Sequence, residues 1–108
     1  MRVVWRGPSD DTWLRAGVTY DVLEVRAEPG RPVQLRVAAE QSGTPALFDS
    51  ARFDTVDGMI PSHWRARLSP GGTLTLGPEE WSAPGFWEAY FDDDPEAVVA
   101  YEQGRVRS

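Results

Sequence analysis

The residue that first suggests catalysis is His63, the only histidine, which lies between Ser62 and Trp64 and follows Asp57 by six positions. Histidine titrates near neutral pH and can act as a general base toward a hydroxyl nucleophile. That chemistry needs nucleophile, base and carboxylate to converge in space, which sequence spacing does not establish. The sequence also contains no nucleophile elbow, glycine-rich phosphate loop or paired-histidine metal motif. We therefore expect His63 to be a packed or surface residue and the protein not to be an enzyme.

A second set of chemically capable residues is an acidic run in the C-terminal part of the chain. It consists of Glu88, Asp92, Asp93, Asp94 and Glu96. Three consecutive aspartates followed by proline do not have the alternating spacing of a calcium loop, so we expect no metal and no cofactor. One interpretation is a solvated face in which Asp94 caps a helix. The other is a surface that captures a basic partner by its charge.

Aromatic residues are interleaved with this acidic run over residues 79–96, namely Trp81, Phe86, Trp87, Tyr90 and Phe91. If the segment is helical, residues 86 and 90, and residues 87 and 91, form two adjacent stripes. One stripe can close the end of a barrel while the other faces outward as an interface anchor. The candidate partner-binding residues are therefore Trp87, Glu88, Tyr90, Asp92, Asp93, Asp94 and Glu96.

A row of arginines offers a competing interpretation. Arg26, Arg36, Arg65 and Arg67 occupy alternating strand positions and could form a basic stripe with Trp64, as in nucleic-acid-binding barrels. The alternative is a solvated row whose aliphatic stems cover the sheet, with some heads paired to the acidic segment.

The charge distribution favours that alternative. Residues 1–67 carry nine arginines and nine acidic residues, whereas residues 68–108 carry two arginines and eight acidic residues, so the whole net charge of −6 lies in the C-terminal part. A field of this sign repels nucleic acid and attracts basic proteins. We therefore expect a protein partner with a basic surface, and no nucleic acid.

The length of 108 residues predicts a single domain with one core. The absence of cysteine excludes disulfides and thiolate metal sites. No apolar run is long enough for a membrane span, and the N-terminus lacks the apolar region of a secretory signal. The expected location is cytoplasmic, with no membrane partner.

The elements that must position these residues are mostly short strands, because apolar and polar residues alternate between turn signals every eight to twelve positions. Strands are predicted at residues 2–6, 19–27, 33–37, 46–48, 52–56, 65–68 and 73–76. Residues 19–27 with 33–37, and 65–68 with 73–76, should form antiparallel hairpins. Turns are expected at residues 7–11, 28–32, 41–45, 57–58 and 69–72.

From Gly77 onward the pattern becomes helical. Helical turns are predicted at 78–81 and 86–91, followed by a helix over 97–106 that Asp94 caps, with Pro95 in the first position. Gly104 weakens this last helix. We expect one domain over residues 1–108, in which a β-barrel (1–77) carries a packed acidic helical segment (78–108).

The motif Leu14-x-x-Gly17-x-x-Tyr20-x-Val22-Leu23 resembles the opening strand of small bacterial SH3-like barrels, although Val18 replaces the polar residue that often follows the glycine. Two later motifs are similar to small acidic bacterial proteins, several of which act as immunity proteins in polymorphic toxin systems. These motifs are Phe53-x-x-Val56-Asp57-Gly58-x-Ile60-Pro61-x-x-Trp64 and Trp81-x-x-Pro84-Gly85-Phe86-Trp87-Glu88-x-Tyr90-Phe91-Asp92-x-Asp94-Pro95-Glu96-Ala97.

Together, these observations predict a mainly β protein: a small SH3-like barrel of antiparallel hairpins with a C-terminal helical, aromatic-rich segment. The expected function is non-enzymatic protein binding, and the resemblance implies an immunity protein that neutralises a basic toxin through its acidic C-terminal surface. The alternative is a structural or accessory domain that self-associates through its aromatic segment. The oligomeric state is left open.

Overall fold

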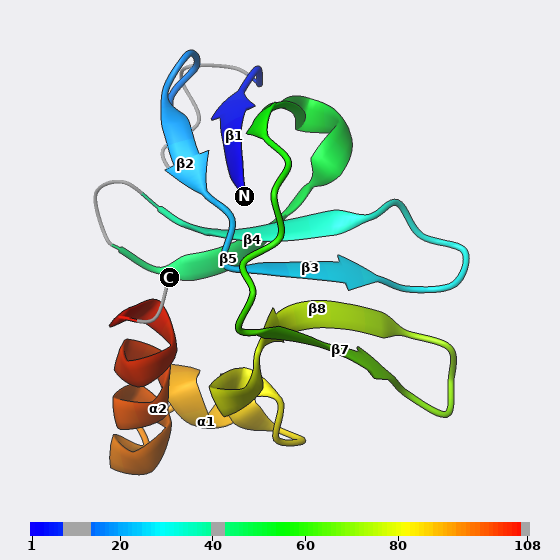
Figure 1. The fold of residues 1–108 in the computed structure, drawn as a ribbon. Coiled ribbons are helices and arrows are strands. Elements are labelled where there is room, and N and C mark those ends of the chain that lie inside the picture. Colours follow the sequence, from blue (N-terminus) through cyan, green and yellow to red (C-terminus); the bar gives the residue numbers. More distant parts are fainter. Residues whose placement is uncertain (8–13, 40–42, 107–108) are drawn as a thin grey trace.

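The protein consists of two antiparallel sheets and a C-terminal helical segment, which Figure 1 shows as successive tiers. The structure is a computed structural model and describes residues 1–7, 14–39 and 43–106. The strands are β1 (Arg2–Trp5), β2 (Thr19–Asp21), β3 (Glu24–Ala27), β4 (Gln34–Ala38), β5 (Pro45–Asp49), β6 (Phe53–Asp57), β7 (Trp64–Leu68) and β8 (Leu74–Pro78). They pair in the order β2-β1-β6 and in the order β5-β4-β3-β8-β7.

Four helical elements complete the chain: the 3-10 turns η1 (Ser50–Arg52) and η2 (Glu79–Trp81), and the helices α1 (Phe86–Phe91) and α2 (Pro95–Val106). The mainly β class, both predicted hairpins and the helical C-terminal segment are therefore confirmed. Most of the turn predicted at 7–11 falls outside the described residues. Of the turn predicted at 41–45, residues 43–45 are described: Gly43 has a left-handed conformation (φ 69°), and β5 begins at Pro45. No helix in the described ranges has the length and apolar composition needed to cross a bilayer.

The chain passes from one sheet to the other at Val22 and Leu23. The Val22 N–H donates to the Met1 carbonyl beside the first sheet (2.9 Å), whereas the Leu23 N–H donates to the Arg36 carbonyl in the second (2.7 Å). Successive side chains in extended backbone point to opposite sides. The Val22 side chain accordingly packs in the core between the two sheets. The Leu23 side chain packs in a second apolar cluster, between the five-stranded sheet and the helical segment. The prediction of one strand over residues 19–27 was wrong for this reason.

A closed SH3-like barrel is not confirmed. Among the described strands, β2 and β6 are the edges of the first sheet, and β5 and β7 are the edges of the second, so neither sheet closes on itself. The two sheets instead pack around one apolar cluster. Its buried members are Val3, Trp5, Leu14, Tyr20, Val22, Leu35, Val37, Phe53 and Trp64.

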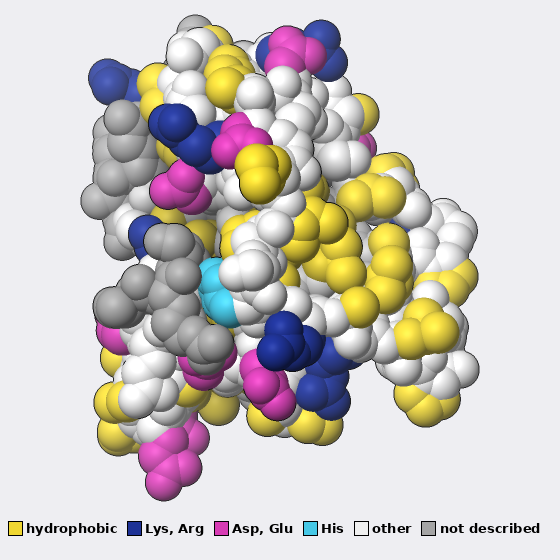
Figure 2. All heavy atoms as spheres, in the orientation of Figure 1, with side chains coloured by type: hydrophobic (Ala, Val, Ile, Leu, Met, Phe, Trp, Pro, Cys, Tyr) yellow, Lys and Arg dark blue, Asp and Glu magenta, His cyan; other side chains and the backbone are white. Residues whose placement is uncertain are grey.

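The five-stranded sheet has one apolar face and one polar face, because its side chains alternate. Figure 2 shows hydrophobic side chains gathered over β3, β8 and β7 on the side facing the viewer. On the opposite face the register sets Glu24 beside Arg36, and Thr75 between Arg26 and Arg67. The predicted arginine row therefore shares one face. Trp64 is not part of it, since its ring lies in the core on the other side.

The helical segment packs through a second cluster of Leu23, Trp81, Phe86, Ala97 and Tyr101. The rings of Trp81 and Tyr101 stack with centroids 5.3 Å apart, and Trp81 Nε1 donates to the Ala100 carbonyl (3.2 Å). A Cβ atom on the buried Gly104 would lie only 2.5 Å from Trp81 Nε1. Gly104, which weakens the helix by propensity, thus permits the close approach of α2 to Trp81.

We expect Gly104→Ala to lower the free energy of unfolding by about 1–3 kcal/mol, because the added methyl group overpacks the Trp81 contact. Helix propensity alone acts in the opposite direction, favouring alanine by about 1 kcal/mol. Urea unfolding followed by tryptophan fluorescence measures the difference. Gln103→Ala, on an exposed position of the same helix, is the control and should change stability little. A stabilised Gly104→Ala variant would contradict the Trp81–α2 packing.

Candidate functional site

An open groove of 560 Å³ lies on the polar face of the five-stranded sheet, between the β7–β8 hairpin and residues 81–88. Its volume is in the range of ligand and peptide sites. The sheet contributes Glu24, Arg26, Arg36, Arg67 and Thr75, and the turn between β7 and β8 contributes Thr73. The groove therefore brings together arginines from three different strands, and its opposite wall comes from the aromatic segment.

A buried ion pair lies at the base of this groove. Arg36 Nε donates to Glu24 Oε1 (3.1 Å), and the two side chains are only 6% and 5% exposed. Arg36 Nη1 also donates to the Pro45 carbonyl (3.2 Å). Burial lowers the pKa of Arg36, and the Glu24 carboxylate opposes that change. Because a guanidinium does not lose its proton under protein conditions, the pair stays charged and each partner needs the other.

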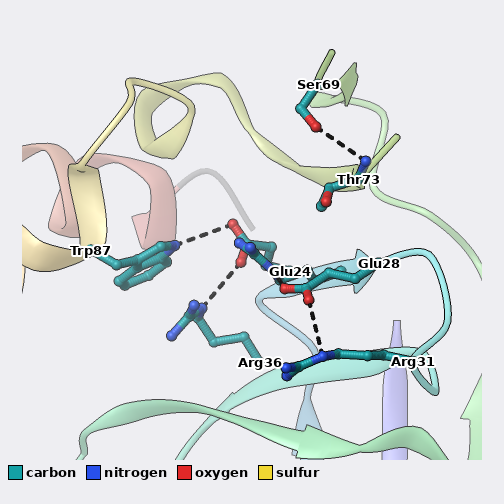
Figure 3. A network of polar contacts seen from close by, with 8 residues as sticks. Glu24, Glu28, Arg31, Arg36, Ser69, Thr73 and Trp87 are labelled. Atoms are coloured by element: carbon teal, nitrogen blue, oxygen red, sulfur yellow. Dashed lines mark hydrogen bonds and ion pairs between the residues drawn. The ribbon is translucent and has the colours of Figure 1, made fainter. Parts of the chain in front are cut away.

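Trp87 completes this pair from α1. Its Nε1 donates to Glu24 Oε2 (3.3 Å), and the Arg36 guanidinium carbon lies 3.9 Å from the centroid of its ring. Figure 3 shows the indole beside the Glu24 carboxylate, with the head of the Arg36 side chain below it. Trp87 was predicted to contact a partner. In the structure its contacts with Glu24 and Arg36 hold α1 on the sheet. Only the exposed remainder of this half-buried side chain is open to a partner.

The other ion pairs among the described residues join residues of the strands or of the turns next to them. Arg26 pairs with Glu28 (2.6 Å), which Arg31 also approaches (3.5 Å); the hydrogen bond from Arg26 is the main cause of the lowered pKa of Glu28. In the three-stranded sheet and next to it, Arg2 pairs with Asp21 (3.6 Å) and Arg6 with Asp54 (3.4 Å). Five of the nine arginines of the N-terminal part, Arg2, Arg6, Arg26, Arg31 and Arg36, are therefore paired with acidic residues of the same part.

The five predicted acidic residues, Glu88, Asp92, Asp93, Asp94 and Glu96, are all exposed, and we call them the acidic surface. Within the described ranges, none of them forms an ion pair with an arginine. The basic stripe of the sheet therefore does not neutralise them, and their charge faces solvent.

Two of the three aspartates also shape the chain between α1 and α2. Asp93 adopts a left-handed conformation (φ 61°), and the N–H groups of Asp93 and Asp94 donate to Tyr90 and Ala89, which is a Schellman ending. Asp94 Oδ1 accepts from the N–H of Glu96 (3.0 Å) and so caps α2, as predicted. Asparagine tolerates the left-handed region and also caps helices, so it can replace these aspartates locally.

The exposure of the aromatic side chains differs from the prediction. Tyr90 is half-buried, its ring lies 4.7 Å from that of Tyr101, and burial raises the pKa of its phenol. Phe91 is 49% exposed, although it is not among the residues predicted to bind a partner. The spacing of residues 86, 87, 90 and 91 indicated two stripes, but the rotation of a six-residue helix is set by its anchor, Trp87.

His63 lies half-buried in the connection between β6 and β7, and its Nε2 has no hydrogen-bond partner among the described residues. No group of three histidine, aspartate or glutamate side chains in the described part is arranged to hold a metal ion.

Comparison of the chain with protein-family models, curated proteins and solved structures finds no match. Inference about function therefore depends on geometry and charge, and the resemblance to immunity proteins stays a hypothesis.

We expect Glu24→Leu or Arg36→Met to destabilise the fold by about 3–5 kcal/mol, since either leaves an uncompensated buried charge. The double variant should cost clearly less than the sum of the two single changes, because neither charge then remains. Urea unfolding measures all three. Asp21→Asn, which breaks an exposed pair, is the control and should cost about 1 kcal/mol or less. Additive effects of the two single changes would show that the pair is not coupled.

Proposed function

We propose that this protein is a non-enzymatic binding domain that docks a basic protein partner on its acidic surface. The observation that carries the proposal is the separation of charge. Arg2, Arg26 and Arg36 of the sheets pair with acidic residues of the N-terminal part, whereas the exposed carboxylates on α1, α2 and the turn between them have no arginine partner among the described residues. A cluster of one sign raises the rate of encounter with an opposite surface, and the effect decreases with salt.

The helical segment is well suited to present this charge. Trp87 holds α1 against the sheet and Trp81 holds α2 against η2, so the positions of the helices that carry the carboxylates are constrained. A preformed surface loses less conformational entropy on binding than a flexible acidic tail. The acidic surface therefore favours a specific interface over a nonspecific polyanion.

The specific form of the proposal is an immunity protein that covers a basic toxin in the bacterial cytoplasm, built on an SH3-like barrel that remains open. The motifs around Phe53 and Trp81 motivate this form. Co-expression with the product of a neighbouring toxin-like gene tests it, with growth and co-purification as readouts. Failure of the protein to bind or protect against that product would reject the immunity form while leaving protein binding open.

Replacing Asp92, Asp93 and Asp94 with asparagine should slow association with a basic probe by about tenfold at low salt, because it removes steering charge. The probe is octa-arginine, and stopped-flow fluorescence at two salt concentrations measures the rate. Unfolding should remain nearly unchanged, since asparagine keeps the cap and the turn.

The matched control is the triple variant Asp21→Asn, Asp54→Asn and Asp57→Asn, which removes the same charge from the three-stranded sheet. The association rate of this control should stay close to that of the unchanged protein. Equal slowing in the two triple variants would mean that net charge, and not the acidic surface, controls binding.

A second candidate function is self-association through the helical segment, which the exposed Phe91 favours. Phe91→Ser should convert any dimer to monomer in light scattering, because it removes exposed apolar area without touching the Glu24–Arg36 pair. Val56→Ser, at an exposed position in β6, is the matched control. A monomer at all concentrations before substitution would reject this candidate.

A further inference from the structure

The groove contains two charged groups that the fold itself does not use. Glu24 is satisfied by Arg36 and Trp87, and Arg26 is engaged by Glu28. The Arg67 side chain on β7 and the Glu88 carboxylate on α1 form no hydrogen bond or ion pair with any residue that the structure describes.

These two groups lie on different sides of the groove. Arg67 comes from the sheet, where it pairs in register with Thr75, and Glu88 comes from the wall formed by residues 81–88. The groove is therefore dipolar, with a cationic side at β7 and an anionic side at α1. Glu88 also belongs to the acidic surface, so the groove and that surface are continuous.

The remaining lining suits an extended chain. Thr73, Thr75 and Ser82 place hydroxyl-bearing side chains along the groove, and Trp87 adds aromatic surface. Leu68, at the end of β7, is 73% exposed and adds apolar surface there. An open trough with mixed polar and apolar lining favours a peptide segment over a small molecule that needs an enclosed cavity.

We propose that this groove accepts an extended segment of the protein partner in which a basic cluster and a carboxylate are a few residues apart. The basic cluster lies over the acidic surface and Glu88, and the carboxylate reaches Arg67. The inference rests on the proposed function and adds to it the orientation of the partner, because the reverse direction would place like charges together at both ends.

The test uses synthetic peptides with three arginines at one end and one glutamate at the other, separated by two, four or six Gly/Ser residues. A matched series carries glutamine in place of glutamate. Dissociation constants come from isothermal titration calorimetry at constant ionic strength, and amide and indole shifts of Thr75 and Trp87 come from NMR. The protein variants are Arg67→Gln and, as a control at an exposed arginine outside the groove, Arg52→Gln.

For at least one spacer, the glutamate peptide should bind about two- to fivefold more tightly than its glutamine counterpart, the range measured for exposed ion pairs. Arg67→Gln should abolish this difference, and Arg52→Gln should preserve it. Thr75 should shift only with the glutamate peptide.

Equal affinities of the two series at every spacer would overturn the orientation but leave the acidic surface intact, because the arginines still bind. Failure of both series to bind would overturn the acidic surface and the groove together. A glutamate effect that survives Arg67→Gln would place the carboxylate elsewhere and would also overturn the inference.

Discussion

The fold depends on one buried polar contact, the pair of Glu24 and Arg36 covered by Trp87. Two buried charges at the base of the groove are stable only if they pair with each other and their remaining donors and acceptors form hydrogen bonds. Pro45 supplies a carbonyl to Arg36, and Trp87 supplies an N–H to Glu24. These contacts hold β3, β4, β5 and α1 together at one site. They give the helical segment one defined position on the sheet.

The same contact explains why the buried Arg36 of the sheet does not pair with the carboxylates of the helical segment. Glu24 pairs with Arg36 and Glu28 pairs with Arg26, so these two arginines do not take up the carboxylates of the helices. The acidic segment is held down instead by aromatic packing, through Trp87 on the sheet and Trp81 against α2. Apolar and cation–π contacts can fix an acidic segment without consuming its charge. The acidic surface thus remains available to a partner.

Local patterns predicted most elements. The alternation at residues 33–37 and the turn at 69–72 gave hairpins that the structure confirms, and Asp94 with Pro95 correctly placed the start of α2. Two features escaped prediction. The strand over 19–27 divides because Val22 and Leu23 serve different clusters, and the sheets stay open because closure depends on pairing between distant strands. Both depend on contacts between residues far apart in the sequence.

For the candidate site, the sequence by itself determined which residues carry charge, that the surplus is acidic and C-terminal, and that arginines share one face of a strand. Those properties follow from composition and from the period of two. Only the tertiary structure decided that Glu24 belongs to Arg36, that Trp87 turns inward while Phe91 remains exposed, and that Arg67 and Glu88 face a common groove. The physical reason is that burial and pairing are properties of packed neighbours, and these neighbours come from β3, β4, β7 and α1, which are distant along the chain.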